Sequence, residues 1–108
     1  MRSRTLASAI GVAAVLGWAA APAPAHAQSA RYLAGNCANC HGTDGHSAGG
    51  GGMPGLAGLS PTYFAEQMKA FRDGTRKATI MHQIAKGYSD QQIAELADYF
   101  GSQQRSSK

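Results

Sequence analysis

Two cysteines and a histidine carry the clearest chemistry in this chain of 108 residues: Cys37, Cys40 and His41 form the pattern Cys-x-x-Cys-His. Residues three and four apart on a helix share one face, so the two sulfurs can bond neighbouring substituents at one edge of a flat macrocycle. His41 follows on the same side and can offer a ring nitrogen to a metal at the macrocycle's centre. The pattern therefore predicts the covalent attachment of one haem c.

A cysteine pair also occurs in redox disulfides of the thioredoxin type and as half of a zinc site. The redox disulfide needs a βαβ setting, which the sequence does not indicate. The zinc site needs a second ligand pair, whereas the chain has only two cysteines. The haem interpretation is therefore preferred.

The identity of a second axial ligand decides between small-molecule binding on an open haem face and electron transfer. Met68 lies on the apolar stripe of an expected helix, where core packing explains it. Met53 follows His41 by only twelve residues and would have to pass round the haem rim. Met81 lies forty residues downstream of His41, beyond a whole helix, so the chain can reach the opposite haem face. We therefore predict that Met81 is the second ligand.

Three further residues are weighed beside Met81. His82 is adjacent and leaves a bis-histidine site as an alternative, although an exposed bystander is the preferred interpretation. His46 is expected to face solvent. From its loop position we hypothesise that the Pro54 carbonyl accepts the N–H of His41. A thioether ligand in an apolar pocket favours ferrous iron, so a raised reduction potential is expected.

The first 27 residues resemble a secretion signal, with Arg2 and Arg4 followed by the apolar run Leu6–Ala20 and the small-x-small site Ala25-His26-Ala27. Cleavage after Ala27 would leave residues 28–108 as one domain in the periplasm, and an uncleaved anchor is the alternative. Ten Lys and Arg against six acids give +4, and loss of the two leader arginines leaves +2. So mild a charge does not indicate nucleic-acid binding.

Hydrophobic spacing and caps predict an all-α domain of four helices. The expected helices are Ser29–His41 with Ser29 as its cap, a helix opened by Ser60-Pro61 and ended by Gly74, Ala78–Lys86, and a helix capped by Ser89 and closed by Gly101; residues 42–58 form a glycine-rich loop.

Two features of these helices allow more than one interpretation. Gly35 lies inside the first helix at a cost of about 1 kcal/mol against alanine, which indicates either a close helix-to-helix contact or simple tolerance. A basic group, Lys69, Arg72, Arg76 and Lys77, lies at or beyond the end of the second helix. It either solvates a face or docks a partner.

The Cys-Ala-Asn-Cys-His segment 37–41, the segment around Met81 and the C-terminal Leu-Ala-Asp-Tyr-Phe of residues 96–100 resemble class I cytochromes c. The resemblance implies a small single-haem fold whose N- and C-terminal helices pack across each other near Gly35 and Tyr99/Phe100, with the haem edge exposed. It also implies roles for five residues: Cys37 and Cys40 as thioether attachments, His41 and Met81 as axial ligands, and Pro54 as the partner of His41.

A narrower resemblance rests on residues 36–45, 53–58, 71–74 and 81–88, which are similar to the cytochrome subunit of flavocytochrome c sulfide dehydrogenases. In that family a separate flavoprotein oxidises sulfide and passes electrons to the cytochrome. The resemblance implies a periplasmic carrier that catalyses nothing alone and has a flavoprotein partner. Carriers of the c-553 and c4 types share much of the pattern, so a free carrier is the alternative. A haem enzyme or gas sensor would need an open distal site.

Overall fold

The computed structural model describes residue 21 and residues 25–48 and 52–105. Within these ranges every regular element is helical: α1 Ala25–His41, the 3-10 helix η1 Thr43–Gly45, α2 Pro61–Asp73, α3 Met81–Ala85 and α4 Asp90–Ser102. The predicted all-α class is therefore confirmed. Most of the expected leader, and three glycines of the loop, lie outside the described residues.

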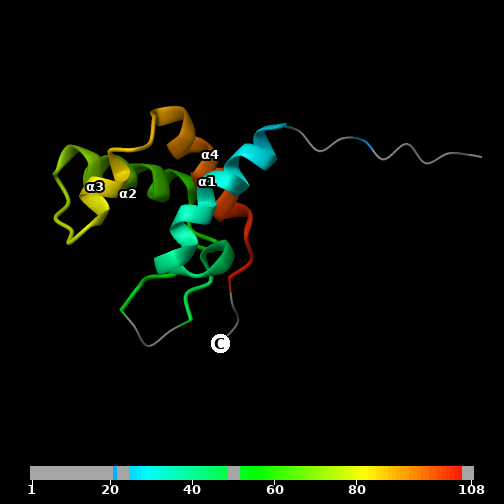
Figure 1. Cartoon of the computed structure of the whole chain (residues 1–108), viewed down its shortest axis with the longest axis horizontal. Helices are drawn as coiled ribbons and strands as arrows, with labels where there is room; N and C mark the ends of the chain where they lie inside the picture. The colour runs from blue at the N-terminus through cyan, green and yellow to red at the C-terminus, as the bar shows by residue number, and fades with distance from the viewer. Residues whose placement is uncertain (1–20, 22–24, 49–51, 106–108) are drawn as a thin grey trace, which may run out of the picture.

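Helices α1 and α4 pack against each other, so the first and last helices of the described chain lie side by side (Figure 1). The close contact considered for Gly35 is contradicted, because a Cβ placed there would meet nothing within 4 Å. The preceding residue, Ala34, is 6% exposed and belongs to the core instead. Tolerance is thus the better explanation of Gly35, and Ala34 is the residue of this turn that is buried in the core with residues of α4.

The core is centred on α2 and α4. The rings of Phe64 and Phe100 lie with centroids 5.5 Å apart, and both side chains are buried. Burial of one such side chain contributes about 1.5–3 kcal/mol. The buried cluster consists of Ala34, Phe64, Met68, Ala85, Tyr88, Ile93, Leu96, Ala97 and Phe100. It joins α1, α2, α3 and α4 through one apolar interior.

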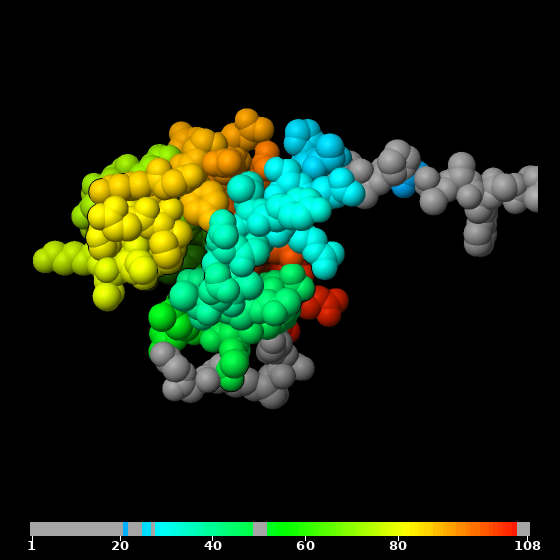
Figure 2. All heavy atoms as spheres, in the orientation of Figure 1, coloured from blue at the N-terminus to red at the C-terminus, as the bar shows by residue number. Residues whose placement is uncertain are grey.

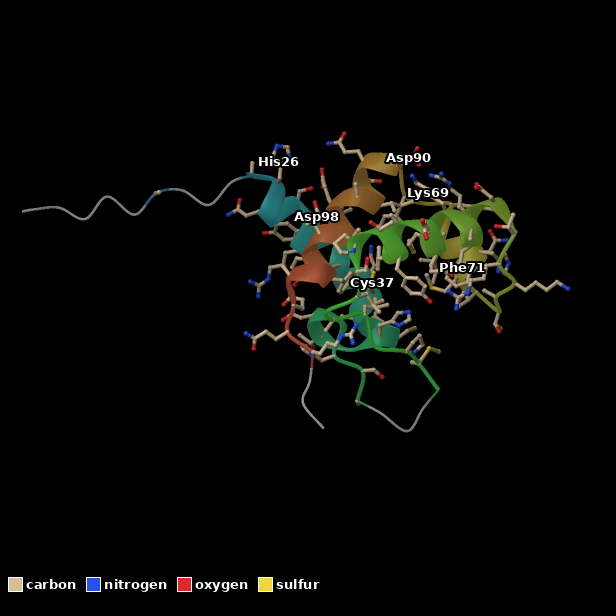
Figure 3. All side chains as sticks on the ribbon, turned by 180° about the vertical axis from the view of Figure 1, so that it is seen from behind. His26, Cys37, Lys69, Phe71, Asp90 and Asp98 are labelled. Carbon is tan, nitrogen blue, oxygen red and sulfur yellow. The ribbon has the colours of Figure 1, made fainter. Side chains whose placement is uncertain are left out.

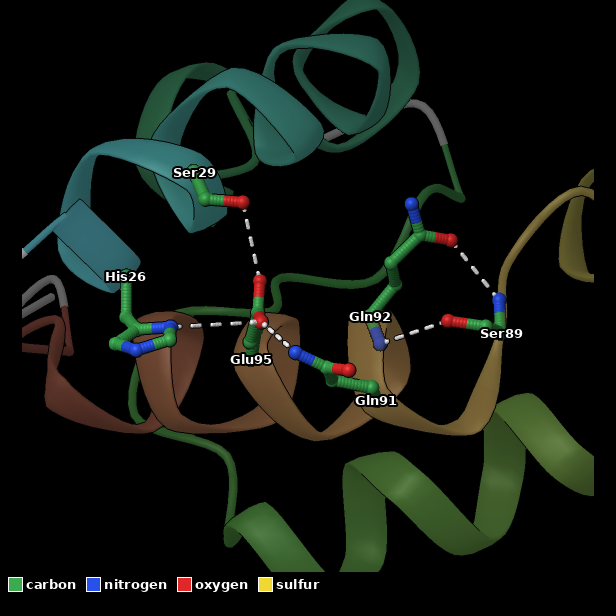
Figure 4. Close-up of polar contacts among 6 residues, drawn as sticks. All are labelled: His26, Ser29, Ser89, Gln91, Gln92 and Glu95. Atoms are coloured by element: carbon green, nitrogen blue, oxygen red, sulfur yellow. Dashed lines mark hydrogen bonds and ion pairs between the residues drawn. The ribbon is translucent and has the colours of Figure 1, made fainter.

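Capping residues set most of the helix ends where the sequence predicts them. Ser60 caps α2 and accepts the Tyr63 N–H, while Gly74 ends this helix with a φ of 78°. Ser89 and Gln92 form the expected capping box of α4 (Figure 4). Helix α3 begins at Met81, three residues later than expected.

The predicted closure of α4 at Gly101 is wrong, because the helix continues to Ser102. A Cβ on Gly101 would lie 2.8 Å from Cγ of Pro61 and 3.2 Å from the Leu59 carbonyl oxygen. The glycine therefore lets the end of α4 approach the start of α2.

The predicted start of the first helix at Ser29 is also wrong. Helix α1 begins at Ala25, and the Ser29 hydroxyl donates to Glu95 Oε2 of α4 at 3.2 Å instead of capping its own helix. Gln91 donates to Glu95 Oε1 at 3.1 Å, and His26 Nδ1 lies 4.0 Å from the same oxygen (Figure 4). The contacts of Ser29 and His26 join α1 to α4 before the cysteine segment begins, while Gln91 holds Glu95 from within α4. Within the described ranges no helix is long and apolar enough to cross a bilayer.

Candidate functional site

A cavity of about 470 Å³ opens between the C-terminal part of α1 and the segment that carries α3. Figure 2 shows the surface hollowed there, between the teal residues of α1 and the yellow residues of α3. The cavity volume lies within the roughly 300–1,000 Å³ of cofactor pockets. Its walls come from residues 36–41, 52–59, 63–71 and 76–84. All five residues singled out from the sequence, Cys37, Cys40, His41, Pro54 and Met81, line it.

The last turn of α1 places both thiols at the cavity. Cys37 is partly buried and Cys40 is exposed, and both thiols are free. Burial raises the pKa of the Cys37 thiol, and the nearby Cys40 raises it further. Two free thiols on one face of a helix suit covalent attachment at one edge of a flat group.

His41 ends α1 and is 8% exposed. Its Nδ1 atom lies 2.8 Å from the carbonyl oxygen of Pro54, and a carbonyl oxygen only accepts, so Nδ1 carries the hydrogen. The other ring nitrogen, Nε2, is then the unprotonated one that can bind a metal.

A compact loop brings Pro54 back to His41. The 3-10 helix η1 begins two residues after the end of α1. The carbonyl oxygen of the buried Gly45 in η1 accepts the amide N–H groups of Leu56 at 2.9 Å and Ala57 at 3.2 Å. Ser47 donates to the carbonyl oxygen of Met53 at 2.7 Å. These bonds close the loop across residues that no local helix or strand pattern would place together.

The three methionines considered from the sequence all line the cavity, with different exposures. Met81 is the first residue of α3 and is partly buried. Met68 is 5% exposed and is part of the core, as expected. Met53 is 47% exposed. Met81 thus combines a cavity position with partial burial, and it packs against the core cluster without being one of its buried members.

The two downstream histidines lie outside the cavity lining. His46 is exposed, as expected. The expectation that His82 is an exposed bystander is wrong, since this residue is half-buried and its Nδ1 atom is buried without a hydrogen-bond partner among the described residues. Helical rotation between neighbouring residues turns His82 away from the wall that Met81 joins.

Two polar residues of the cavity were missed from the sequence. Arg76 donates from Nη1 to Gln67 Oε1, and its guanidinium carbon lies 4.6 Å from the centroid of the Phe71 ring. From the sequence, Arg76 is assigned only to the basic group, and Gln67 is not singled out as a site residue. For Gln67 a signal was present in its helical register with Phe71, because residues 64, 67, 68 and 71 share one face of α2. Arg76 lies beyond the end of α2 at Asp73, so no helical register indicates it.

The basic group is not one uniform surface. Arg72 Nη1 lies 2.8 Å from Asp90 Oδ1, and its Nε lies 3.6 Å from Asp73 Oδ1. Arg72, with a smaller effect from Lys69, holds the pKa of Asp90 below its usual range; Figure 3 shows Lys69 and Asp90 on neighbouring helices. Lys77, by contrast, is exposed and lines the cavity.

The donor set fits a haem c. The cavity is lined largely by apolar side chains, with two free thiols on one helical face and a histidine that has one ring nitrogen fixed. The thioether side chain of Met81, from α3, also lines the cavity. Within the described residues no group of three or more His, Cys, Asp or Glu side chains could hold a bare metal ion. An iron bound through a macrocycle is therefore the better match.

Comparison with known proteins agrees with this geometry. The family model described as cytochrome c matches residues 27–104, and the chain belongs to that family. It is 40% identical to the cytochrome subunit of sulfide dehydrogenase from Chlorobaculum tepidum, over 90% of this chain and 87% of the relative. It is 45% identical to cytochrome c-554(548) from Halomonas halodenitrificans, over 65% of this chain and 87% of the relative. Covalent haem c and electron transfer follow from family membership.

Solved structures show the same fold. The cytochrome c4 structure from Acidithiobacillus ferrooxidans aligns with a TM-score of 0.64 at 33% identity, over 72% of this chain and 50% of that one. A thiosulfate dehydrogenase structure from Marichromatium purpuratum aligns with a TM-score of 0.68 at 32% identity, over 75% of this chain and 19% of that one. The chain thus corresponds to one cytochrome unit within larger proteins.

The chain is accordingly a haem c electron carrier and not an enzyme. Its function requires another redox protein as partner. The predicted fold class, cofactor and general function are therefore confirmed.

Proposed function

We propose that Cys37 and Cys40 hold one haem c by thioether bonds and that His41 and Met81 are its two axial ligands. The observation that carries this proposal is that the lining of one cavity, about 470 Å³ in volume, contains all four side chains. Cys37, Cys40 and His41 come from the end of α1, whereas Met81 comes from the start of α3. Ligands from two separate elements suit the two faces of a planar group.

Haem c, when bound, supplies an iron that changes between the ferrous and ferric states. His41 presents Nε2 while Pro54 accepts the hydrogen on Nδ1, which makes the imidazole a stronger electron donor. The thioether of Met81 is a soft, neutral ligand that favours the ferrous state. Apolar side chains such as Phe64 and Met68 exclude water and disfavour the additional ferric charge. A raised reduction potential is the expected balance.

The proposed physiological role is that of the electron-accepting cytochrome subunit of a flavocytochrome c sulfide dehydrogenase. The similarity to the Chlorobaculum tepidum subunit supports this role, because it extends over most of both chains. The partner would be the flavoprotein subunit that oxidises sulfide. Export to the periplasm, with cleavage after Ala27, is part of the same proposal.

A free carrier for another donor is the second candidate. The chain is 37% identical to the thiosulfate dehydrogenase electron acceptor from Thiomonas intermedia, over 93% of this chain and 45% of that protein. It is also 40% identical to cytochrome c4 from Pseudomonas aeruginosa, over 65% of this chain. These relatives favour electron transfer in general over one particular donor.

Absorption spectroscopy of the ferric, haem-loaded protein tests the ligand assignment. A sulfur-to-iron charge-transfer band is expected, together with slow binding of cyanide and, after reduction, of carbon monoxide. Absence of the band with fast binding of both ligands would show an open distal site, as in a haem enzyme or gas sensor.

Purification of the tagged protein from its native host tests the partner. Co-purification of a flavoprotein, with haem reduction by sulfide only in its presence, is the expected result. A monomer that a different dehydrogenase reduces equally well without any flavoprotein would favour the free carrier.

A further inference from the structure

Asp44 has the most unusual backbone conformation near the proposed haem site. Its φ of 53° is positive, and among the described residues no other residue except glycine has a positive φ. Such a conformation is unfavourable for a residue with a Cβ and persists where surrounding contacts hold it. Asp44 follows His41 by three residues. The contacts that hold Asp44 therefore act close to the proposed axial ligand.

One such contact comes from the last turns of α4. The hydroxyl of Tyr99 donates to Asp44 Oδ1. The Tyr99 ring lies edge-on to that of Phe100, with centroids 5.2 Å apart. Burial raises the pKa of the Tyr99 phenol, and the bond to Asp44 raises it further. The hydroxyl therefore remains a donor to the carboxylate at neutral pH.

The loop that orients His41 has two arms, residues 42–47 and residues 53–58. Asp44 belongs to the first arm and Pro54 to the second. Gly45 joins the arms by accepting the amide N–H groups of Leu56 at 2.9 Å and Ala57 at 3.2 Å. A Cβ on Gly45 would lie 2.7 Å from the Ala57 nitrogen. The arms are thus in close contact at Gly45, the residue that directly follows Asp44.

Helix α4 holds the second arm as well. The carbonyl oxygen of Phe100 accepts the Gly58 N–H at 2.8 Å, and a Cβ on Gly45 would lie 2.9 Å from Phe100 Cδ1. Two consecutive residues of α4 therefore hold the two arms, Tyr99 through Asp44 and Phe100 through Gly58. The hydrogen bond from His41 to Pro54 closes the same loop.

We propose that Tyr99 is a positioning residue for His41: through its bond to Asp44 it holds the loop that keeps the Pro54 carbonyl on Nδ1 of the imidazole. The inference rests on the proposed function, in which His41 is an axial ligand. It assigns to α4 a part in setting the reduction potential as well as in packing against α1.

The variant Tyr99→Phe tests the proposal because it removes the hydroxyl and keeps the ring. In the haem-loaded protein, the His41 Nδ1–H should exchange with solvent roughly tenfold faster, as for loss of one charge-assisted hydrogen bond. The reduction potential should rise, because a weaker bond to Pro54 makes the imidazole a poorer donor to ferric iron. General loosening that admits water would lower the potential instead, because water stabilises the ferric charge. The sign of the change separates the two causes.

Tyr32→Phe is the matched control, since Tyr32 on α1 is 84% exposed. Loss of its hydroxyl should leave both the exchange rate of the His41 Nδ1–H and the reduction potential unchanged. Asp44→Gly is an independent second variant, because it removes the carboxylate and relieves the positive φ. It should reproduce the changes seen for Tyr99→Phe. The double variant should add nothing further, because both substitutions remove the same bond.

The proposal is overturned if Tyr99→Phe leaves the exchange rate and potential at wild-type values, if its potential falls, or if the two substitutions add. If Tyr99→Phe does not fold, Asp44→Gly decides by the same measurements. Failure of the underlying ligand assignment is seen separately, because wild-type protein would then lack the haem-shifted nitrogen signals of His41 in its NMR spectrum.

Discussion

Nδ1 of His41 lies 2.8 Å from the carbonyl oxygen of Pro54, so a residue at the end of α1 is oriented by a loop residue with no regular structure around it. Proline fixes its own φ and thereby limits where its carbonyl can point. Pro54→Ala keeps the carbonyl and loses this restraint. We expect a stability loss of about 0.4–1 kcal/mol, with a reduction potential above that of the wild type. Redox titration and urea unfolding measure the two effects, and an unchanged His41 orientation and potential would argue against the role of Pro54.

Met81→Ala should remove the sulfur-to-iron charge-transfer band and let cyanide and carbon monoxide bind quickly. The reason is that the thioether would no longer occupy the distal side, and the reduction potential should fall with its loss. Met53→Ala is the control, because Met53 lines the same cavity but is 47% exposed. A band retained in Met81→Ala and lost in Met53→Ala would reverse the ligand assignment.

Gly35→Ala should stabilise the protein by about 0.5–1 kcal/mol, because alanine is the better helix former and a Cβ there meets nothing within 4 Å. Gly101→Ala should instead destabilise it by about 1–3 kcal/mol, because its Cβ would lie 2.8 Å from Pro61 Cγ. Urea unfolding followed by haem absorbance compares the two. Equal effects of the two substitutions would show that the helix contacts differ from those described.

The sequence alone was sufficient to predict the features whose local signals agree with the tertiary structure. The capping box of Ser89 and Gln92, the Ser60 cap and the Cys-x-x-Cys-His segment all act within a few residues, so pattern alone places them. Errors arose where a distant partner decides the outcome. Ser29 has the type of an N-cap, yet Glu95 of α4 binds its hydroxyl inside a longer helix.

Other features depend on contacts that no spacing rule shows. Gly101 has the type of a helix terminator, yet its role is set by Pro61. The bond between Tyr99 and Asp44 joins residues 55 positions apart, and the pairing of Arg76 with Gln67 depends on how the chain returns after α2. Pro54 could be proposed from its loop position alone, which gives no distance to His41.

The stability of the protein should fall at alkaline pH because of Tyr99. Burial, and secondly the hydrogen bond to Asp44, raise the pKa of its phenol in the folded state above the usual value for tyrosine. The folded protein then binds this proton more tightly than the unfolded chain, so the contribution is complete below the unfolded pKa and is lost as pH rises through the folded one. Urea unfolding at about pH 8 and about pH 11 should show a smaller loss for Tyr99→Phe than for the wild type. Equal losses would mean that other groups cause the alkaline instability.

Lys77 should contribute more than Lys86 to association with an acidic redox partner. Lys77 is exposed and lines the cavity, whereas Lys86, also exposed, follows α3 away from it. The charge of Arg72 is offset by Asp90 and Asp73, and the Arg76 guanidinium is held by Gln67 and the Phe71 ring. Among the described cations that line the cavity, Lys77 is the one whose side chain has no such contact to hold it. A charge beside the electron-exchange edge accelerates the encounter with a partner of opposite charge, and salt screens it.

Stopped-flow reduction of the haem by its partner, measured over a range of salt concentrations, tests this difference. Lys77→Ala should slow the second-order rate at low salt by several-fold and flatten its salt dependence, in the manner of a lost rim charge. Lys86→Ala should have a smaller effect, and the two variants should converge at high salt, where the Debye length falls to about 3 Å at 1 M. If Lys86→Ala proved the slower variant, the partner would dock on the far side of α3 and electrons would not enter beside Lys77.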